Sequence, residues 1–224
     1  MPGGAAAIGE PWRMAAAYLD AAFEGSPPED LDVVHRNAGR WDDVVSVARA
    51  GVSSPPTSSA GRLFDAVAAI AGVRDAVNYE GQAAIELEQR ADLGERLAYG
   101  AALVGERPFR IRGTDIVRAV VDDLTAGVDG SVVAGRFHNA VAALIVAGAE
   151  RLREETGLAT VALSGGVFQN VLLLDRVCPD LERRGLRVLT HAWVPPNDGG
   201  ISLGQAAVAG AGGVSPDGRD PGIG

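Results

Sequence analysis

Hydrophobic positions in the first half of the chain recur at helical spacing, and polar loops interrupt them. In "EPWRMAAAYLDAAFEG" the repeat carries Trp12 and Leu19, and in "RLFDAVAAIAG" it carries Leu63 and Val67. Pro- and Ser-rich stretches such as "SPPEDLD" and "VSSPPTSSAG" break the pattern. Together with shorter repeats in "RWDDVVSVARAG" and "YEGQAAIELEQRAD", this predicts a mainly helical segment over residues 1–96.

In the second half, short apolar runs alternate with amphipathic stretches. The segment "LAYGAALVGERPFRIR" fits two short strands around a polar turn. Two helices follow it, the first with Thr114 as its expected N-cap and the second ending at Gly157. The chain then predicts a strand, a helix, a strand and a helix over residues 159–163, 167–184, 186–190 and 199–210. This order indicates an α/β layer with parallel strands over residues 97–211, before a Gly- and Pro-rich, disordered tail over residues 212–224.

Composition and charge narrow the classes of function. The chain has 224 residues, which suits one large domain or two small ones, and 47% of them are apolar, enough to fill a core. The net charge is −9 and no basic run exceeds two residues, so nucleic acid is a disfavoured partner. No signal-peptide pattern opens the chain, and no charge-free run of about 18 apolar residues occurs. We therefore expect a cytoplasmic protein that does not enter a membrane.

A glycine-rich turn, "LSGGVFQN" at residues 163–170, joins the predicted strand to the helix. Glycine lets a ligand approach the backbone, and a helix N-terminus offers unpaired N–H groups. Gly165, Gly166 and Asn170 are therefore candidate contacts for a phosphate or for the polar edge of a ring. Alternatively, the two glycines only permit a tight turn, since the motif is neither a P-loop nor a dinucleotide-binding fingerprint.

A second turn, "VPPNDGGISLGQAA", precedes the last predicted helix. Its Asp198 is either an ordinary helix N-cap or a carboxylate that faces a cation. The carboxyl ends of neighbouring parallel strands meet at one edge of a sheet, where ligands commonly bind. We therefore expect the two glycine-rich turns to lie side by side.

Three of these motifs resemble, in this order, the C-terminal part of the HypF-type carbamoyltransferases of nickel–iron hydrogenase maturation. They are "SSAGRLFDAVAAI…YEGQAAIELE", "LSGGVFQNVLLLDRV" and "VPPNDGGISLGQA". The segments "EPWRMAAAYL" and "RFHNAVAALI" are similar to the same family, so the resemblance covers about residues 3–210. It implies a Kae1-like fold of the actin/Hsp70-like (ASKHA) class. This chain would supply one RNase H-like half of that fold, with a helical insertion.

The resemblance also implies an activity. Such proteins carry, upstream, an acylphosphatase-like domain, zinc-finger segments, a YrdC-like domain and the first half of the Kae1-like domain. The YrdC-like domain makes carbamoyl-adenylate from carbamoyl phosphate and ATP, and the Kae1-like domain passes the carbamoyl group to the C-terminal cysteine of a partner, HypE. On this interpretation "MPGGAAAIGEPWRM" joins the two halves, and the chain alone has little or no transfer activity.

Particular positions acquire roles through the same resemblance. Asp65 matches an aspartate that accepts hydrogen bonds from the nucleotide ribose, and Gly81 matches a backbone position beside the nucleoside. Gly165, Gly166 and Asn170 match the loop that holds the adenosine and phosphate portion. Spacing alone favours a solvent-facing helix aspartate at position 65, and the alternative for Gly81 is a helix-start glycine.

The resemblance further implies a divalent metal, with Asp198 as its one carboxylate ligand and two histidines supplied by the first half of the domain. His35, His138 and His191 are the only histidines here, and none pairs at the helical spacing of a metal site. His138 lies in a long helix and is expected to be buried and hydrogen-bonded. Cys178, the single cysteine, cannot form an internal disulfide and is expected to be a small core residue.

Two alternatives remain open. The first alternative to the HypF-type interpretation is a different enzyme of this fold, such as a small-molecule O-carbamoyltransferase or the tRNA threonylcarbamoyl-transferring relative. The second is a non-catalytic module that binds a nucleotide or a protein. "SSAGRLFDA" and "VFQNVLLL" fit the HypF type better, and the acidic charge argues against tRNA.

Overall fold

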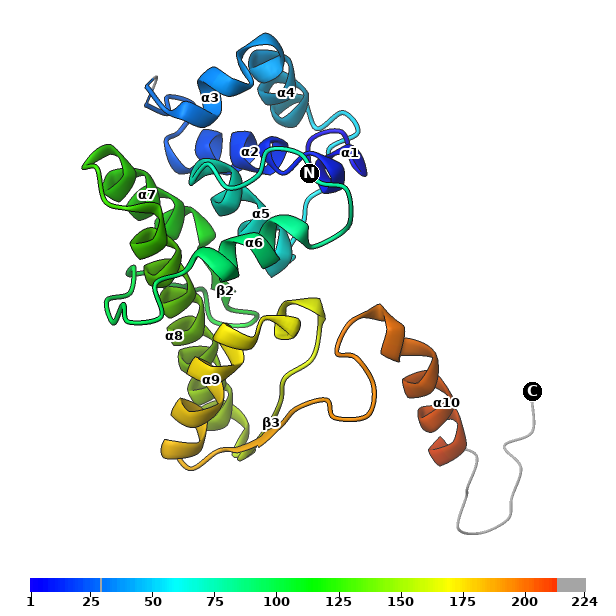
Figure 1. Ribbon diagram of the computed structural model, residues 1–224. Coiled ribbons are helices and arrows are strands. Elements are labelled where there is room, and N and C mark those ends of the chain that lie inside the picture. Colours follow the sequence, from blue (N-terminus) through cyan, green and yellow to red (C-terminus); the bar gives the residue numbers. More distant parts are fainter. Residues whose placement is uncertain (29, 213–224) are drawn as a thin grey trace, which may run out of the picture.

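The computed structural model describes residues 1–28 and 30–212 (Figure 1). The helices are α1 (Ala6–Gly9), α2 (Trp12–Ala22), α3 (Asp32–Arg36), α4 (Ala38–Ala50), α5 (Ala60–Ile70), α6 (Gln82–Arg90), α7 (Gly113–Thr125), α8 (Gly130–Thr156), α9 (Val171–Arg183) and α10 (Ile201–Gly212). The strands are β1 (Leu103–Val104), β2 (Arg110–Ile111), β3 (Thr160–Ala162) and β4 (Arg187–Leu189). Short 3-10 helices, η1 (Gly166–Gln169) and η2 (Asp198–Gly200), follow β3 and β4. The predicted α/β class is confirmed.

The helix α2 lies at the centre of the helical half, in contact with α4, α5 and α7. Trp12 and Leu19, the positions that carry its hydrophobic repeat, are buried, and the ring of Trp12 stacks on Trp41 of α4 with centroids 6.0 Å apart. The helix α7 begins at Gly113 with Arg112 at its N-cap, so the expected cap at Thr114 is wrong.

The long helix α8 is the central element of the second half, and α6, α7 and α9 pack along it (Figure 1). Its Phe137 is fully buried and meets the ring of Phe64 from α5 edge-on, with centroids 4.7 Å apart. In the part of the chain that the structure describes, α8 is the one helix long and apolar enough to cross a membrane. Its apolar window is 67% buried inside the protein, as expected of a core helix.

The strands β3 and β4 pair in parallel, with Val161 opposite Val188, as the β-α-β pattern predicts. The connecting helix α9 packs on α8 and β4 through fully buried side chains at helical spacing, Leu173, Val177 and Leu181. The strands β1 and β2 form the antiparallel pair expected within residues 97–112.

Two predicted helices begin differently from the expectation. The helix predicted over residues 167–184 is split into η1 and α9, with Asn170 between them as the N-cap of α9 rather than on its first turn. The helix predicted from residue 199 is preceded by η2, whose N-cap is Asn197, so the interpretation of Asp198 as an N-cap is wrong.

The main buried cluster contains residues from both sides of position 96, so the helices of both predicted segments share one core. The division at residue 96 stays a prediction. The disordered tail expected over residues 212–224 lies outside the described residues, except for Gly212 at the end of α10.

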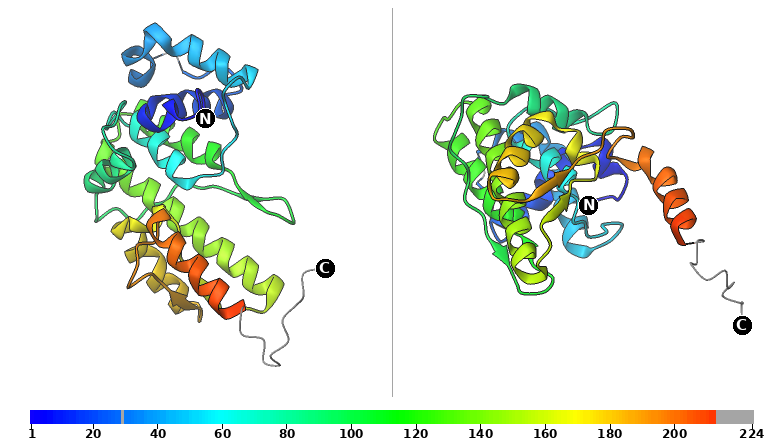
Figure 2. Two further views of the ribbon diagram at one scale, coloured as in Figure 1. Left: turned by 90° about the vertical axis from the view of Figure 1, so that its right-hand side faces the viewer. Right: turned by 90° about the horizontal axis from the view of Figure 1, so that it is seen from below.

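The helix α10 stands away from the rest of the molecule (Figures 1 and 2). Its contacts are chiefly with η2, and residues 201–211 are all exposed, including the apolar side chains of Leu203 and Val208. Trp193, in the loop before η2, is 98% exposed. Both this loop and α10 therefore expose apolar side chains.

Replacement of Phe137 by alanine tests the shared core. The change removes a fully buried aromatic ring between α5 and α8, so we expect the free energy of unfolding to fall by about 3–5 kcal/mol. Urea unfolding measures it. Leu158→Ala is the control, because that side chain is 68% exposed and should change the value by at most about 0.5 kcal/mol. Equal effects of the two changes would contradict the assignment of the core.

Candidate functional site

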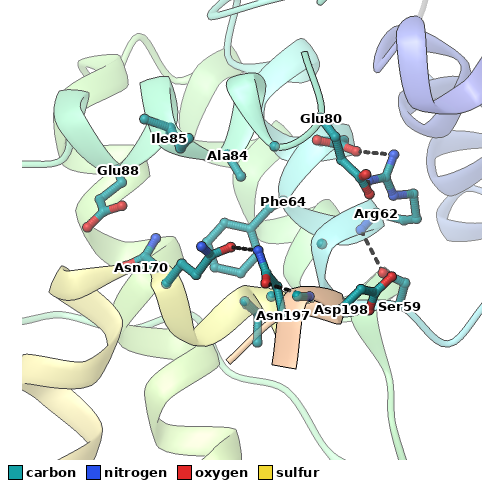
Figure 3. Close-up of a pocket in the computed structure, with 17 residues that line it drawn as sticks. Ser59, Arg62, Phe64, Glu80, Ala84, Ile85, Glu88, Asn170, Asn197 and Asp198 are labelled. Atoms are coloured by element: carbon teal, nitrogen blue, oxygen red, sulfur yellow. Dashed lines mark hydrogen bonds and ion pairs between the residues drawn. The ribbon is translucent and has the colours of Figure 1, made fainter. Parts of the chain in front are cut away.

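A cleft of about 670 Å³ opens between α5, α6 and the two glycine-rich turns (Figure 3). Its volume lies in the range of small-molecule sites. Five of the six site residues singled out from the sequence line it: Asp65, Gly81, Gly166, Asn170 and Asp198. Segments from residue 59 to residue 199 therefore converge on one cleft.

The two glycine-rich turns lie side by side, as the sequence predicts. The N–H of Gly165, the sixth predicted residue, donates to the carbonyl oxygen of Pro196 at 2.8 Å. The side-chain amide of Asn197 donates to Gln169 Oε1 at 3.2 Å. Gly165 has a φ of 106°, a conformation that side chains with a Cβ rarely adopt. Gly165 thus joins the two turns through its N–H group and does not line the cleft, whereas its neighbour Gly166 does.

Free backbone donors in the cleft are fewer than the sequence suggests. Among the described residues, neither Gly166 N–H nor Val167 N–H donates to a protein acceptor, so both remain for a ligand. Two of the first three amides of α9, by contrast, are already bonded. Glu88 of α6 accepts from Leu172 N at 3.1 Å, and the Asn170 side chain accepts from Leu173 N at 2.7 Å. In this part of the cleft the unbonded backbone N–H groups therefore lie in the η1 turn.

Asp65 lies at the base of the cleft and is 3% exposed. Its Oδ2 lies 2.8 Å from Nη1 of Arg62, which is itself 8% exposed, one turn earlier on α5. The alignment does not suit a hydrogen bond, so within the described residues both atoms are buried without a hydrogen-bond partner. A second carboxylate, Glu80, lies 3.8 Å from Arg62 Nη2 at the rim. Asp65 thus offers the cleft a buried carboxylate whose one charged neighbour on α5, Arg62, makes no aligned hydrogen bond to it.

Burial raises the pKa of Asp65 from its ordinary value of 3.8 to about 6. The Arg62 cation opposes this rise and the Glu80 carboxylate adds to it. Since desolvation outweighs the ion pair, the charged form of Asp65 is held at a cost that a ligand can offset. The expectation of an exposed helix aspartate is wrong.

Asn170 and Gly81 take part in the local structure as well as in the cleft. The Asn170 amide nitrogen lies 3.0 Å from His138 Nε2, and its oxygen caps α9. Gly81 is the N-cap of α6 with a φ of 83°, so the helix-start interpretation also holds for it. Both residues line the cleft, and their roles in ligand binding stay proposals.

The described residues do not form a complete metal site. Asp198 is the first residue of η2 and lines the cleft, but within residues 1–28 and 30–212 no group of three or more His, Cys, Asp and Glu side chains gathers around a possible ion. A divalent cation needs several ligands. The residues present therefore do not fit the implied metal without additional ligands.

The remaining candidates lie outside the cleft lining. His138 is fully buried and hydrogen-bonded, as expected. His191 is exposed, and its Nε2 lies 3.0 Å from Ser164 Oγ. Cys178 packs partly against the core, and burial raises the pKa of its thiol, so it is not a reactive thiolate. His35, near the end of α3, is far along the chain from the site.

Sequence reasoning missed Arg62, Phe64 and Glu88, which also line the cleft. Arg62 stands three residues before Asp65, and that spacing on a helix would have identified the ion pair. Glu88 contacts Leu172 only through the tertiary fold, so no local pattern in the sequence reveals it.

The parallel β-α-β unit and the cleft lined by its two turns and Asp65 fit the class of fold that the resemblance of the sequence implies. The profile "Carbamoyltransferase, Kae1-like Domain, second subdomain" matches residues 1–205. The chain belongs to the HypF carbamoyltransferase family.

Relatives agree with this assignment. Carbamoyltransferase HypF2 of Cupriavidus necator is 36% identical over 93% of this chain, and carbamoyltransferase HypF of Rhizobium leguminosarum is 37% identical over 93%. The chain spans only 28% and 26% of these relatives' lengths. The crystal structure of full-length HypF in its phosphate- and nucleotide-bound form superposes with a TM-score of 0.86 at 35% identity. The superposed region covers 94% of this chain and 33% of the full-length HypF chain. The predicted Kae1-like fold is confirmed.

The burial of Asp65 can be tested by measuring how protein stability depends on pH. Because this pKa is higher in the folded than in the unfolded chain, protonation favours folding, and the contribution of Asp65 to stability falls as the pH rises from about 4 to about 6. Asparagine does not titrate. We expect the stability of Asp65→Asn relative to the wild type to rise by about 2–3 kcal/mol between pH 4 and pH 7.5.

Urea unfolding of both proteins at the two pH values measures this difference. Other carboxylates, such as Glu86 and Glu95 with their lowered pKa values, titrate in both proteins and cancel. A relative stability that does not change with pH would show that Asp65 is solvated.

Proposed function

We propose that this chain supplies the adenylate-binding part of a HypF-type carbamoyltransferase. In this reaction a carbamoyl group passes from carbamoyl-adenylate to the C-terminal cysteine of a HypE-type acceptor during nickel–iron hydrogenase maturation. The observation that carries the proposal is the buried carboxylate of Asp65, which lines one cleft together with two glycine-rich turns. The nucleotide-bound form of a full-length relative supports the ligand class.

The chemistry is an acyl transfer between a mixed anhydride and a thiolate. The sulfur attacks the carbamoyl carbon, the bond from that carbon to the phosphate oxygen breaks, and AMP leaves with its electron pair. No group in the cleft of this chain has to act as the nucleophile, because the acceptor cysteine provides it. The task of these residues is to bind and orient the adenylate.

Each part of the nucleotide has a matching group in the cleft. The Asp65 carboxylate accepts hydrogen bonds from the ribose hydroxyls, and Arg62 keeps its charge compensated. The N–H groups of Gly166 and Val167 donate to the phosphate. Gly81 lets the nucleoside approach the start of α6, where it has no Cβ.

The implied metal would bind with Asp198 as one ligand and polarise the group being transferred. Its other ligands come from outside the described residues, which hold no suitable cluster. We therefore propose that this chain acts together with the preceding part of a HypF-type protein, whose YrdC-like domain makes carbamoyl-adenylate from carbamoyl phosphate and ATP. In that setting it works in the cytoplasm.

The role of Asp65 is tested with a pair of nucleotides. We expect Asp65→Asn to weaken AMP binding about 10- to 100-fold, because a charge-assisted hydrogen bond to a hydroxyl is worth about 1.5–3 kcal/mol. 2′,3′-Dideoxy-AMP lacks both hydroxyls and should bind wild type and variant alike. NMR titration of the ¹⁵N-labelled protein gives the dissociation constants.

The matched control is Asp122→Asn, an exposed aspartate on α7 outside the cleft, which should leave both affinities unchanged. If Asp65→Asn weakened the dideoxy nucleotide as much as AMP, Asp65 would not contact the ribose. AMP binding that is equal in wild type and Asp65→Asn would remove Asp65 from the site.

Transfer itself is tested by supplying carbamoyl-adenylate and a HypE-type acceptor and detecting the thiocarboxamide by mass spectrometry. We expect little or no product with the 224-residue chain alone and product when the preceding part of a HypF-type protein is added. The missing metal ligands are the reason. Turnover by the chain alone would contradict the requirement for that part.

A further inference from the structure

Beneath the cleft, His138 of α8 joins the helical core to the glycine-rich turn. The side chain is 0% exposed and does not line the cleft. The rings of Phe64 and Phe137 enclose it, with centroids 5.3 Å and 5.7 Å from that of the imidazole. Its two nitrogen atoms each have one polar neighbour, Ala134 O for Nδ1 at 2.7 Å and Asn170 Nδ2 for Nε2 at 3.0 Å.

These contacts determine where the hydrogens lie. A carbonyl oxygen can only accept, so Nδ1 of His138 carries the hydrogen and donates it to Ala134 O. The bare Nε2 then accepts from the amide nitrogen of Asn170. The Asn170 oxygen, on the other side, accepts from Leu173 N at 2.7 Å and caps α9. Each partner thereby fixes the orientation of the next.

The imidazole has to be neutral for this chain of bonds to exist. A hydrogen on Nε2 would face the Asn170 amide hydrogens, and two donors repel. Burial lowers the pKa of His138 to about 4, so the neutral form is present at physiological pH. Arg176 of α9 is the charged group that lowers it further.

We infer that His138 is a positioning residue of the adenylate site: through Asn170 it holds the η1 turn, with its two free N–H groups, in the geometry that binds the phosphate. The inference rests on the proposed function. Asn170 directly follows Gly166–Gln169, so a shift of its backbone, once its side chain lost the bond to His138, would move the turn that carries Gly166 and Val167. His138 itself touches no ligand.

The first test needs no variant and no nucleotide. ¹⁵N NMR of the imidazole groups distinguishes the tautomers, and the protein has only three histidines to assign. We expect His138 to be neutral with the hydrogen on Nδ1 at pH 7. The Nε2–H tautomer, or a charged ring, would overturn the inference whatever the outcome of the nucleotide experiments.

The second test compares variants in AMP affinity and in amide hydrogen exchange at Gly165 and Leu173. His138→Phe removes both hydrogen bonds and should weaken AMP binding about tenfold or more and accelerate exchange at both amides. His138→Gln keeps an oxygen acceptor of comparable reach and should stay within about threefold of the wild type.

The matched control is Val177→Ala, a fully buried change on α9 that lowers stability without touching the turn. It should leave AMP affinity within about threefold. If Val177→Ala weakened AMP binding as much as His138→Phe, or if glutamine rescued nothing, His138 would only be a core residue. Accelerated exchange with unchanged AMP affinity would likewise contradict its role in binding.

Discussion

The helical core around α5 buries the Asp65 carboxylate, and the counter-charge beside it is that of Arg62. The chemistry of the cleft depends on this burial. A carboxylate in this position is stable only because the surrounding core is well packed. Phe64 and Phe137 meet edge-on beside it, and α2 packs along the same helix. The energy lost by desolvating the carboxylate is recovered when a donor reaches it. The burial that raises the free energy of the Asp65 carboxylate therefore also favours the binding of a ligand that donates a hydrogen bond to it.

An acidic protein that binds a phosphate has to attract the anion locally. The net charge of −9 disfavours long-range attraction of an anion. At the start of α9, Glu88 and Asn170 already accept from the amides of Leu172 and Leu173. Two backbone donors in η1 remain, in the β3–α9 connection, which Gly165 joins to the second glycine-rich turn. Recognition of the anion rests on directed hydrogen bonds whose positions are set before the ligand arrives.

Local periodicity predicted the larger helices and the parallel β3–β4 pair, because each has several residues on one buried face. It missed α1 and α3, which are too short to show a repeat, and it joined η1 to α9 because a 3-10 turn and a helix share their apolar spacing. The cleft residues Gly166 and Asp198 were candidates from the glycine-rich turns themselves, whereas Asp65 was found through motif resemblance. The bond from Glu88 to Leu172 and the partnership of His138 with Asn170 link residues far apart in sequence, so only the folded chain reveals them.

The three tryptophans differ sharply in their surroundings. Trp12 and Trp41 are stacked inside the helical half, whereas Trp193 lies almost wholly in water a few residues before the second glycine-rich turn. Its indole emission will therefore be red-shifted and open to collisional quenchers, while that of the other two is shielded. The molecule thus carries an intrinsic fluorescent reporter in the loop that leads to the second glycine-rich turn, and any protein surface that covers this loop will shift the emission towards the blue.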